Sequence, residues 1–134
     1  MKYLVDTNIV IRFFRGEEKV VSRINQLIDK GIGISSVSLA ELYHGAEKSM
    51  KTKQGIRDIK RLLDVPDIQA LNFKDKEARE FGKLMNKLEK AGLKISPVDL
   101  LIAVTAKVNK LIILTGDKKH FSRLNRFGIK VEAL

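Results

Sequence analysis

The most constraining feature of the sequence is the alternation of short apolar segments with longer stretches of helical periodicity. Short apolar segments rich in β-branched residues predict strands, and the amphipathic stretches between nearly all of them predict helices. Strands that alternate with helices form βαβ units, whose strands run parallel. We therefore predict an α/β fold with a parallel sheet flanked by helices. The predicted strands are Tyr3–Val5, Ile32–Ile34, Ile68–Leu71, Leu111–Leu114 and Ile129–Val131.

Two helical stretches, residues 20–28 and 78–91, each carry one apolar stripe and are followed by a glycine, Gly31 and Gly92. Such a stripe predicts a helix that covers the sheet, and glycine is the preferred residue just after a helix. Residues 98–109 differ, because apolar side chains surround this helix almost completely. We therefore expect it to be buried.

No repeat and no linker rich in glycine, serine or proline divides the 134 residues, so we expect a single domain over residues 1–134. The absence of cysteine and the presence of only 2 histidines exclude disulfide scaffolds, zinc fingers and cysteine nucleophiles. The longest apolar run, Leu100–Val104, is too short to cross a membrane. Asp6 interrupts the first apolar stretch before a signal-peptide core forms, so we expect a cytoplasmic protein.

The chain is strongly basic, because 26 lysines and arginines against 16 aspartates and glutamates give a net charge of +10. A surplus of this size attracts polyanions such as nucleic acids. Part of it lies on one side of the helix predicted for residues 52–64, which carries Lys53, Arg57, Lys60 and Arg61. The alternative is that this stripe is an ordinary solvated helix face.

Four acidic residues occupy positions that a parallel sheet brings to one edge. Ligands of such folds bind outside the carboxyl ends of the strands, where the following helices begin. Asp6 directly follows the first predicted strand, and Asp117 comes shortly after the fourth. Glu41 lies in the second turn of a helix that begins near Ser36 or Ser38, and Asp99 lies in the first turn of the buried helix.

Each acid taken alone has a simpler explanation as a helix cap. Glu41 and Asp99 complete the spacing of a capping box after Ser38 and Ser96, respectively. Asp6 and Asp117 fit N-cap positions. The combination favours a site, because Glu41 faces away from the apolar stripe of its helix and is free to face the sheet edge. Asp99 shares a face with apolar residues and has no lysine or arginine nearby in sequence, so its charge needs another partner.

Carboxylates gathered at one edge would repel one another strongly. At about 5 Å and an effective dielectric constant of about 20, each pair costs about 3 kcal/mol, whereas a small domain has a net stability of only about 5–15 kcal/mol. The cluster must therefore spread out, bind protons or bind a divalent cation. A site made only of carboxylates selects Mg²⁺ or Mn²⁺. An acidic pocket on a basic surface indicates hydrolysis of phosphodiester bonds.

The segments around these acids resemble those of PIN-domain ribonucleases, most closely the VapC toxins of VapBC toxin–antitoxin modules. The resemblance covers essentially the whole chain, and the motifs follow the family's order and spacing. The matching segments are Tyr3–Asn8, Ser36–Gly45, Asp99–Ala106 and Leu114–Asp117, the last with His120 and Phe121 after it.

The resemblance implies a metal-dependent endoribonuclease with a five-stranded sheet in the order 3-2-1-4-5, a homodimer, and inhibition by a cognate antitoxin. It implies that Mg²⁺ or Mn²⁺ is held, directly or through water, by the catalytic residues Asp6, Glu41, Asp99 and Asp117. It further implies supporting hydrogen bonds from Thr7, Asn8 and Thr115. Val98 departs from the polar residue that many family members carry, so contacts beside the third acid differ here.

The basic residues after the last acid are candidates for contacts with RNA phosphates, namely Lys118, Lys119, Arg123 and Arg126. An equally simple interpretation is a solvated basic surface. His44 and His120 lie close in sequence to two of the acids, but we expect both to be surface histidines outside the catalytic set.

Other functional classes fit less well. A receiver-like signalling domain also has acids at the carboxyl edge of a parallel sheet, but it needs an acidic pair after the first strand and a lysine after the last. Here the acid after the first strand is single, and Glu41 and Asp99 would have no role. A PIN domain that processes RNA, or that only binds it, is a further alternative. Four intact acids argue against a silent domain, and a small antitoxin gene beside this one would separate a toxin from a processing enzyme.

Overall fold

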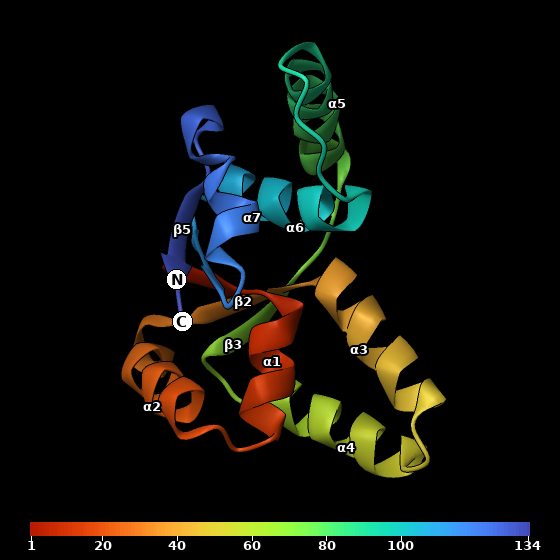
Figure 1. Ribbon diagram of the computed structural model, residues 1–134. Helices are drawn as coiled ribbons and strands as arrows, with labels where there is room; N and C mark the ends of the chain where they lie inside the picture. The colour runs from red at the N-terminus through yellow and green to blue at the C-terminus, as the bar shows by residue number, and fades with distance from the viewer.

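Figure 1 shows the computed structural model, which describes residues 1–134 as a sheet between two layers of helices. The strands are β1 (Tyr3–Val5), β2 (Ile32–Ser35), β3 (Ile68–Leu71), β4 (Ile112–Thr115) and β5 (Lys130–Ala133). The helices are α1 (Thr7–Phe14), α2 (Glu18–Leu27), α3 (Ser36–Lys48), α4 (Thr52–Leu63), α5 (Asp75–Lys90), α6 (Pro97–Val108) and α7 (Lys118–Ser122). Two 3-10 turns, η1 (Ile28–Lys30) and η2 (Asn125–Phe127), precede β2 and β5.

The five strands are all parallel and lie in the order β3-β2-β1-β4-β5, as predicted. Leu4 of the central strand pairs with Gly33 on one side and with Ile113 on the other. The pairing continues for one residue past β1, since the amide of Asp6 donates to the carbonyl of Leu114 at 2.9 Å. Asp6 therefore lies at the middle of the carboxyl edge of the sheet.

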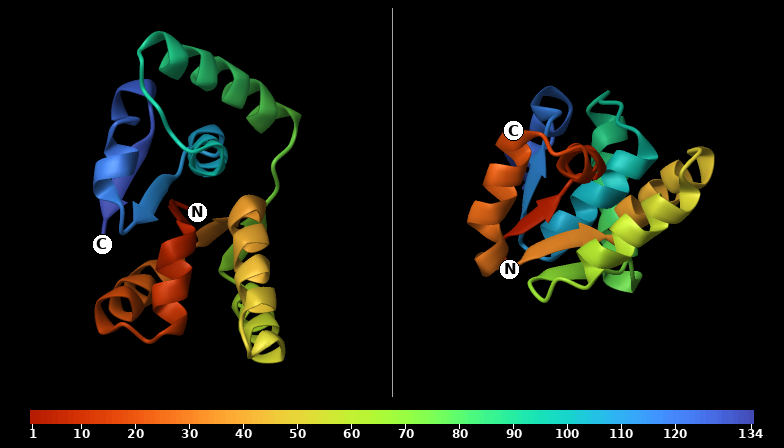
Figure 2. Two further views of the ribbon diagram at one scale, coloured as in Figure 1. Left: turned by 45° about the vertical axis from the view of Figure 1, so that its right-hand side comes forward. Right: turned by 90° about the horizontal axis from the view of Figure 1, so that it is seen from below.

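Successive residues of β1 face opposite sides of the sheet, so the strand contributes to two separate cores. Tyr3 and Val5 belong to a cluster with side chains of α1, α2 and α4, whereas Leu4 belongs to a cluster with side chains of α5 and α6. The views in Figures 1 and 2 show the two corresponding layers, with α1, α2 and α4 on one side and α5 and α6 on the other. The predicted flanking of the sheet by helices is confirmed.

The helix predicted to be buried is α6, and the prediction is confirmed. Its residues Leu100, Ile102, Ala103 and Val104 are fully buried between the sheet and α5. The helix begins with Pro97 at its first position, where the missing amide hydrogen of proline has no cost. This start places Asp99 in the first turn, next to the carboxyl edge of the sheet.

Two helices lie outside the helical stretches predicted from periodicity, and both follow an acid that fits an N-cap position. The segment of α1 is rich in β-branched and aromatic residues, which favour strands by local preference. It forms a helix because Asp6 caps it and because Ile9 and Val10 pack into the core. The short helix α7 begins in the same way after Asp117. Both helices start at the carboxyl edge of the sheet.

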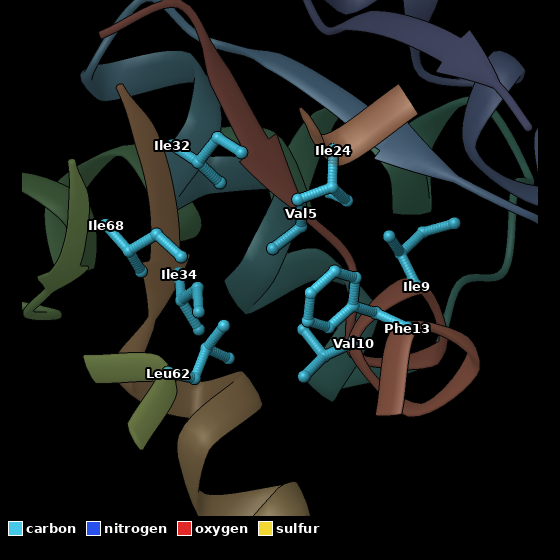
Figure 3. A pocket seen from close by; sticks show the side chains of 9 residues that line it. All are labelled: Val5, Ile9, Val10, Phe13, Ile24, Ile32, Ile34, Leu62 and Ile68. Atoms are coloured by element: carbon cyan, nitrogen blue, oxygen red, sulfur yellow. The ribbon is translucent and has the colours of Figure 1, made fainter. Parts of the chain in front are cut away.

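A small cavity inside the first core is lined only by apolar side chains. Figure 3 shows its nine lining side chains, all apolar, from β1, β2, β3, α1, α2 and α4. A cavity without a hydrogen-bond donor or acceptor offers nothing to an ion or a phosphate, so it belongs to the packing and not to a functional site. No helix of the structure combines the length and apolar character required to cross a membrane.

Candidate active site

The candidate site is built around Asp6, whose side chain is fixed at both oxygens. The residue is only 5% exposed. Oδ1 accepts a hydrogen bond from the amide of Thr7 at 2.8 Å, and Oδ2 accepts one from the hydroxyl of Thr115 at 2.8 Å. Asp6 is therefore a helix cap, as the simpler explanation predicted. Its burial and its second hydrogen bond go beyond what a cap requires.

Thr115, the last residue of β4, connects Asp6 with Asp117. It is fully buried, and its hydroxyl donates to Asp6 while accepting the amide hydrogen of Asp117 at 2.9 Å. The Asp117 carboxylate accepts the amide of His120 at 3.1 Å and is otherwise exposed. The two acids that follow β1 and β4 are thus joined by one buried threonine.

Glu41 reaches the site from α3, in the second turn of that helix as predicted. It does not take part in a capping box, because Ser35 and not Ser38 caps α3. Its side chain is exposed, and Oε1 accepts a hydrogen bond from the hydroxyl of the buried Thr7 at 2.6 Å. Since Thr7 also donates its amide to Asp6, it connects the second acid with the first.

Asp99 is half-buried and contacts a histidine. Nε2 of His120 lies 3.0 Å from Oδ2 of Asp99, without the alignment of a hydrogen bond. The guanidinium of Arg123 lies 3.2 Å from Nδ1 of the same ring and can only donate, so a neutral ring would carry its hydrogen on Nε2, the nitrogen nearer to Asp99. The expectation of a surface histidine is correct for the exposed His44 and is corrected for His120.

The acids share one electrostatic environment. Burial raises the pKa of the Asp6 carboxyl above its ordinary value. The hydrogen bonds from Thr115 and Thr7 oppose this rise, and the negative charges of Asp99 and Glu41 add to it. Asp6 is therefore a buried carboxylate whose charge is destabilised both by its surroundings and by two neighbouring acids.

None of the four acids forms an ion pair with a lysine or arginine, although the net charge of the chain is +10. No three acidic or histidine side chains lie close enough together to hold one ion as they stand. The carboxylates are spread along the edge, which lowers their repulsion. Clustered carboxylates were expected to spread out, to bind protons or to bind a divalent cation. The structure shows the first, and the raised pKa of Asp6 favours the second.

This arrangement of strands and acids matches a known family. The sequence profile of the PIN domain matches residues 3–126. The chain belongs to the PIN-domain family. The matched segment contains all four acids of the candidate site and four strands of the sheet, β1 to β4.

Relatives of this PIN domain are named as ribonucleases. Ribonuclease VapC2 of Haemophilus influenzae is 35% identical over 92% of this chain and 92% of its own length. The tRNA(fMet)-specific endonuclease VapC of Shigella flexneri is 31% identical over 98% of this chain and 97% of its own length. Because both alignments are nearly complete, the PIN domain belongs with the VapC proteins.

Solved structures of VapBC complexes have the same fold. The matching chain of VapBC2 from Rickettsia felis, bound to a DNA fragment from the promoter, has a TM-score of 0.89 at 30% identity, covering 99% of this chain and 98% of its own. VapBC-1 from nontypeable Haemophilus influenzae gives a TM-score of 0.85 at 30% identity with the same coverage. The predicted PIN fold is confirmed.

The predicted RNA-binding residues are exposed near the carboxyl end of β4 and beyond it: Lys118, Lys119, Arg123 and Arg126. The two arginines already have partners in the structure. Arg123 donates to the carbonyl of Lys94 at 2.8 Å, and the guanidinium of Arg126 lies 4.9 Å from the ring centre of Phe127. The two lysines form no ion pair and are the free cations next to Asp117.

Sequence reasoning missed two polar residues of this PIN domain, Ser35 and Ser38. Both are fully buried, and their hydroxyl groups lie behind Thr7. The signal was two serines close to a predicted strand end and shortly before Glu41, but helix capping explains such serines equally well. Asn8, a predicted supporting residue, is exposed on α1 beside this network.

Proposed function

We propose that this protein is a metal-dependent endoribonuclease that cleaves RNA phosphodiester bonds and acts as the toxin of a type II toxin–antitoxin module. The observation that carries the proposal is the set of acids without a lysine or arginine partner at the carboxyl edge of a strongly basic protein. The proposed catalytic residues are Asp6, Glu41, Asp99 and Asp117. The ribonuclease and endonuclease names of the VapC relatives support the same reaction.

The donor set at this edge fits Mg²⁺ or Mn²⁺. Its side-chain donors are carboxylate oxygens, which hard divalent cations prefer, and the chain has no cysteine. The buried Asp6 in particular has a raised pKa and no cationic partner, so a cation would offset an existing cost. We assign the same four acids as ligands, directly or through water. When bound, the cation supplies polarisation of the phosphoryl oxygen and a more acidic water.

The residues of the chain prepare this edge before RNA binds. Thr115 and the amide of Thr7 fix the two oxygens of Asp6, so the central acid needs little reorganisation. Glu41 and Asp117 are exposed on the same edge, which leaves the site accessible to a long polymer. The supporting roles proposed for Thr7 and Thr115 follow from these contacts, and Asn8 is proposed to act from the exposed face of α1.

The proposed partners follow from the family. The structural neighbours are VapBC complexes, so we propose a cognate antitoxin as the protein partner and RNA as the substrate. The homodimer and the single domain over residues 1–134 stay predictions. An enzyme that acts on cellular RNA is expected in the cytoplasm.

The function is tested by incubating the purified protein with RNA in the presence of Mg²⁺, Mn²⁺ or EDTA. Cleavage is expected with either cation and is expected to stop in EDTA, because the chelator removes the cation that would polarise the phosphoryl oxygen and make the attacking water more acidic. Undiminished cleavage in EDTA would contradict the metal-dependent mechanism. RNA binding without cleavage under all three conditions would identify a binding module instead.

The exposed lysines next to Asp117 are expected to contribute to RNA affinity. Replacing Lys118 and Lys119 with alanine should weaken binding to all sequences similarly, because phosphate contacts carry no sequence information. The dependence of log affinity on log salt concentration should flatten by up to about 1.4, since each contact to a single strand contributes about 0.7. Fluorescence anisotropy with single-stranded RNA measures this slope.

The matched control for the lysine variant replaces Lys19 and Lys30, which are exposed on α2 and η1. This control removes the same charge and should leave the slope nearly unchanged. Equal slopes in both double variants would remove the lysines beside Asp117 from the RNA path. The basic stripe of α4 with Lys53, Arg57, Lys60 and Arg61 would then be the better candidate.

A further inference from the structure

A chain of three buried hydroxyl groups, those of Ser35, Ser38 and Thr7, lies behind Glu41. Ser35 ends β2 and Ser38 lies in the first turn of α3, and both are fully buried. Oγ of Ser38 lies 3.2 Å from Oγ of Ser35 and 2.9 Å from Oγ1 of Thr7. Thr7 in turn lies 2.6 Å from Oε1 of Glu41. The chain therefore joins β2, α3 and α1 and ends on an acid of the candidate site.

The acid at the end of this chain sets the direction of its hydrogen bonds. An ionised carboxylate only accepts, so the single hydroxyl hydrogen of Thr7 is donated to Glu41. The oxygen of Thr7 then has only lone pairs left, and Ser38 must donate to it. By the same argument Ser35 donates to Ser38. All three hydroxyl hydrogens point toward Glu41.

We propose that Ser38 is a positioning residue that orients Glu41 for metal binding by fixing the hydroxyl of Thr7. The inference rests on the proposed function, because it assigns a purpose to the orientation of Glu41. Glu41 is exposed and has several rotatable bonds, so it needs an anchor to present one carboxylate geometry. Hydrogen-bonding partners of metal ligands typically contribute about 10- to 100-fold to metal affinity.

The geometry separates this role from helix capping. Ser35 caps α3 by accepting the amide hydrogen of Ser38 at 3.0 Å, and this bond does not involve the hydroxyl of Ser38. Removing that hydroxyl therefore leaves the cap in place and interrupts only the chain toward Glu41. The substitution Ser38→Ala is thus specific for the positioning role.

The test compares Ser38→Ala with Ser36→Ala, a matched control at a position in the same helix whose side chain makes no hydrogen bond. Isothermal titration with Mn²⁺ should show binding weakened by up to about 10-fold in Ser38→Ala, which acts on Glu41 through Thr7, and unchanged in Ser36→Ala. Ser38→Thr, which keeps the hydroxyl, should bind Mn²⁺ nearly as the wild type does. Equal Mn²⁺ affinity in Ser38→Ala and Ser36→Ala overturns the proposal.

A control for the loss of stability alone is Thr105→Val. Thr105 is also fully buried, and its hydroxyl donates to the carbonyl of Leu101 within α6, away from Glu41. This variant should lose thermal stability without losing Mn²⁺ affinity. A merely structural Ser38 would behave in the same way, so a Ser38→Ala protein that loses stability alone also overturns the proposal.

Crystal structures of the two alanine variants give a readout that does not depend on metal. In Ser38→Ala, Glu41 should leave Thr7 or occupy several rotamers, whereas in Ser36→Ala it should keep the contact. A wild type that binds no Mn²⁺ and cleaves no RNA would refute the proposed function. A Glu41 that stays on Thr7 in Ser38→Ala would refute the positioning role independently of that result.

Discussion

Replacing Asp6 with asparagine is expected to reduce RNA cleavage at least about 100-fold, because losing even an indirect partner of a metal site costs about 10- to 100-fold. The substitution removes the charge of the central acid and keeps its shape. The asparagine oxygen still accepts the amide of Thr7, so the cap of α1 is retained. Single-turnover cleavage at saturating Mn²⁺ measures the effect.

The same substitution is expected to leave the thermal unfolding midpoint unchanged or higher at neutral pH. Burial raises the pKa of Asp6, so the ionised side chain destabilises the folded state at all pH values above that pKa. As the pH falls through this raised pKa, Asp6 becomes protonated in the folded state, and below about 4, the ordinary pKa of an aspartate, it is protonated in the unfolded state as well, so the cost disappears. The advantage of the Asp6→Asn variant should therefore be largest at neutral pH and fade toward acid.

The matched control is Asp29→Asn, at an exposed position that precedes β2 at the opposite edge of the sheet. It should change neither cleavage nor the pH profile of stability. Full activity of the purified Asp6→Asn protein would remove Asp6 from the catalytic centre. A clear loss of stability at neutral pH would mean that the cap matters more to the fold than the cost of the buried charge.

The sheet was predictable because its three inner strands, β1, β2 and β4, are buried and largely apolar. The strands at Tyr3–Val5 and Ile68–Leu71 have the predicted bounds. The ends of the other three strands lie within one or two residues of their predicted positions. The helix α1 was not predictable, because its local preference is that of a strand. Packing of Ile9 and Val10 into the core decides its structure, and that packing depends on the whole fold.

The acids were predictable one by one, but their connections were not. Chain order alone indicates that residues following parallel strands meet at one edge, and the charges of Asp99 and Glu41 do act on Asp6. The hydrogen bond from Thr7 to Glu41 instead joins residues 34 positions apart, across the contact of α1 with α3. The approach of His120 to Asp99 likewise requires the position of α7 beside α6, which no local pattern indicates.

Millimolar Mn²⁺ is expected to raise the unfolding midpoint of the wild type and to have little effect on the Asp99→Asn/Asp117→Asn double variant. A cation that binds only the folded state stabilises it by mass action, by about 1.4 kcal/mol at ten times its dissociation constant. For a domain of this size that corresponds to a rise of about 5 °C. Differential scanning fluorimetry with and without Mn²⁺ measures the shift.

The control for the metal effect is the Asp29→Asn/Asp67→Asn double variant, which removes two exposed acids from the opposite edge of the sheet. It should keep the wild-type shift, because the proposed ligands are intact. The shift in the Asp99→Asn/Asp117→Asn protein should stay small even at higher Mn²⁺ concentrations, since two of the four proposed ligands have lost their charge. Equal shifts in all three proteins would show that the ion acts elsewhere on the surface, and the assignment of the four acids as a metal site would then fail.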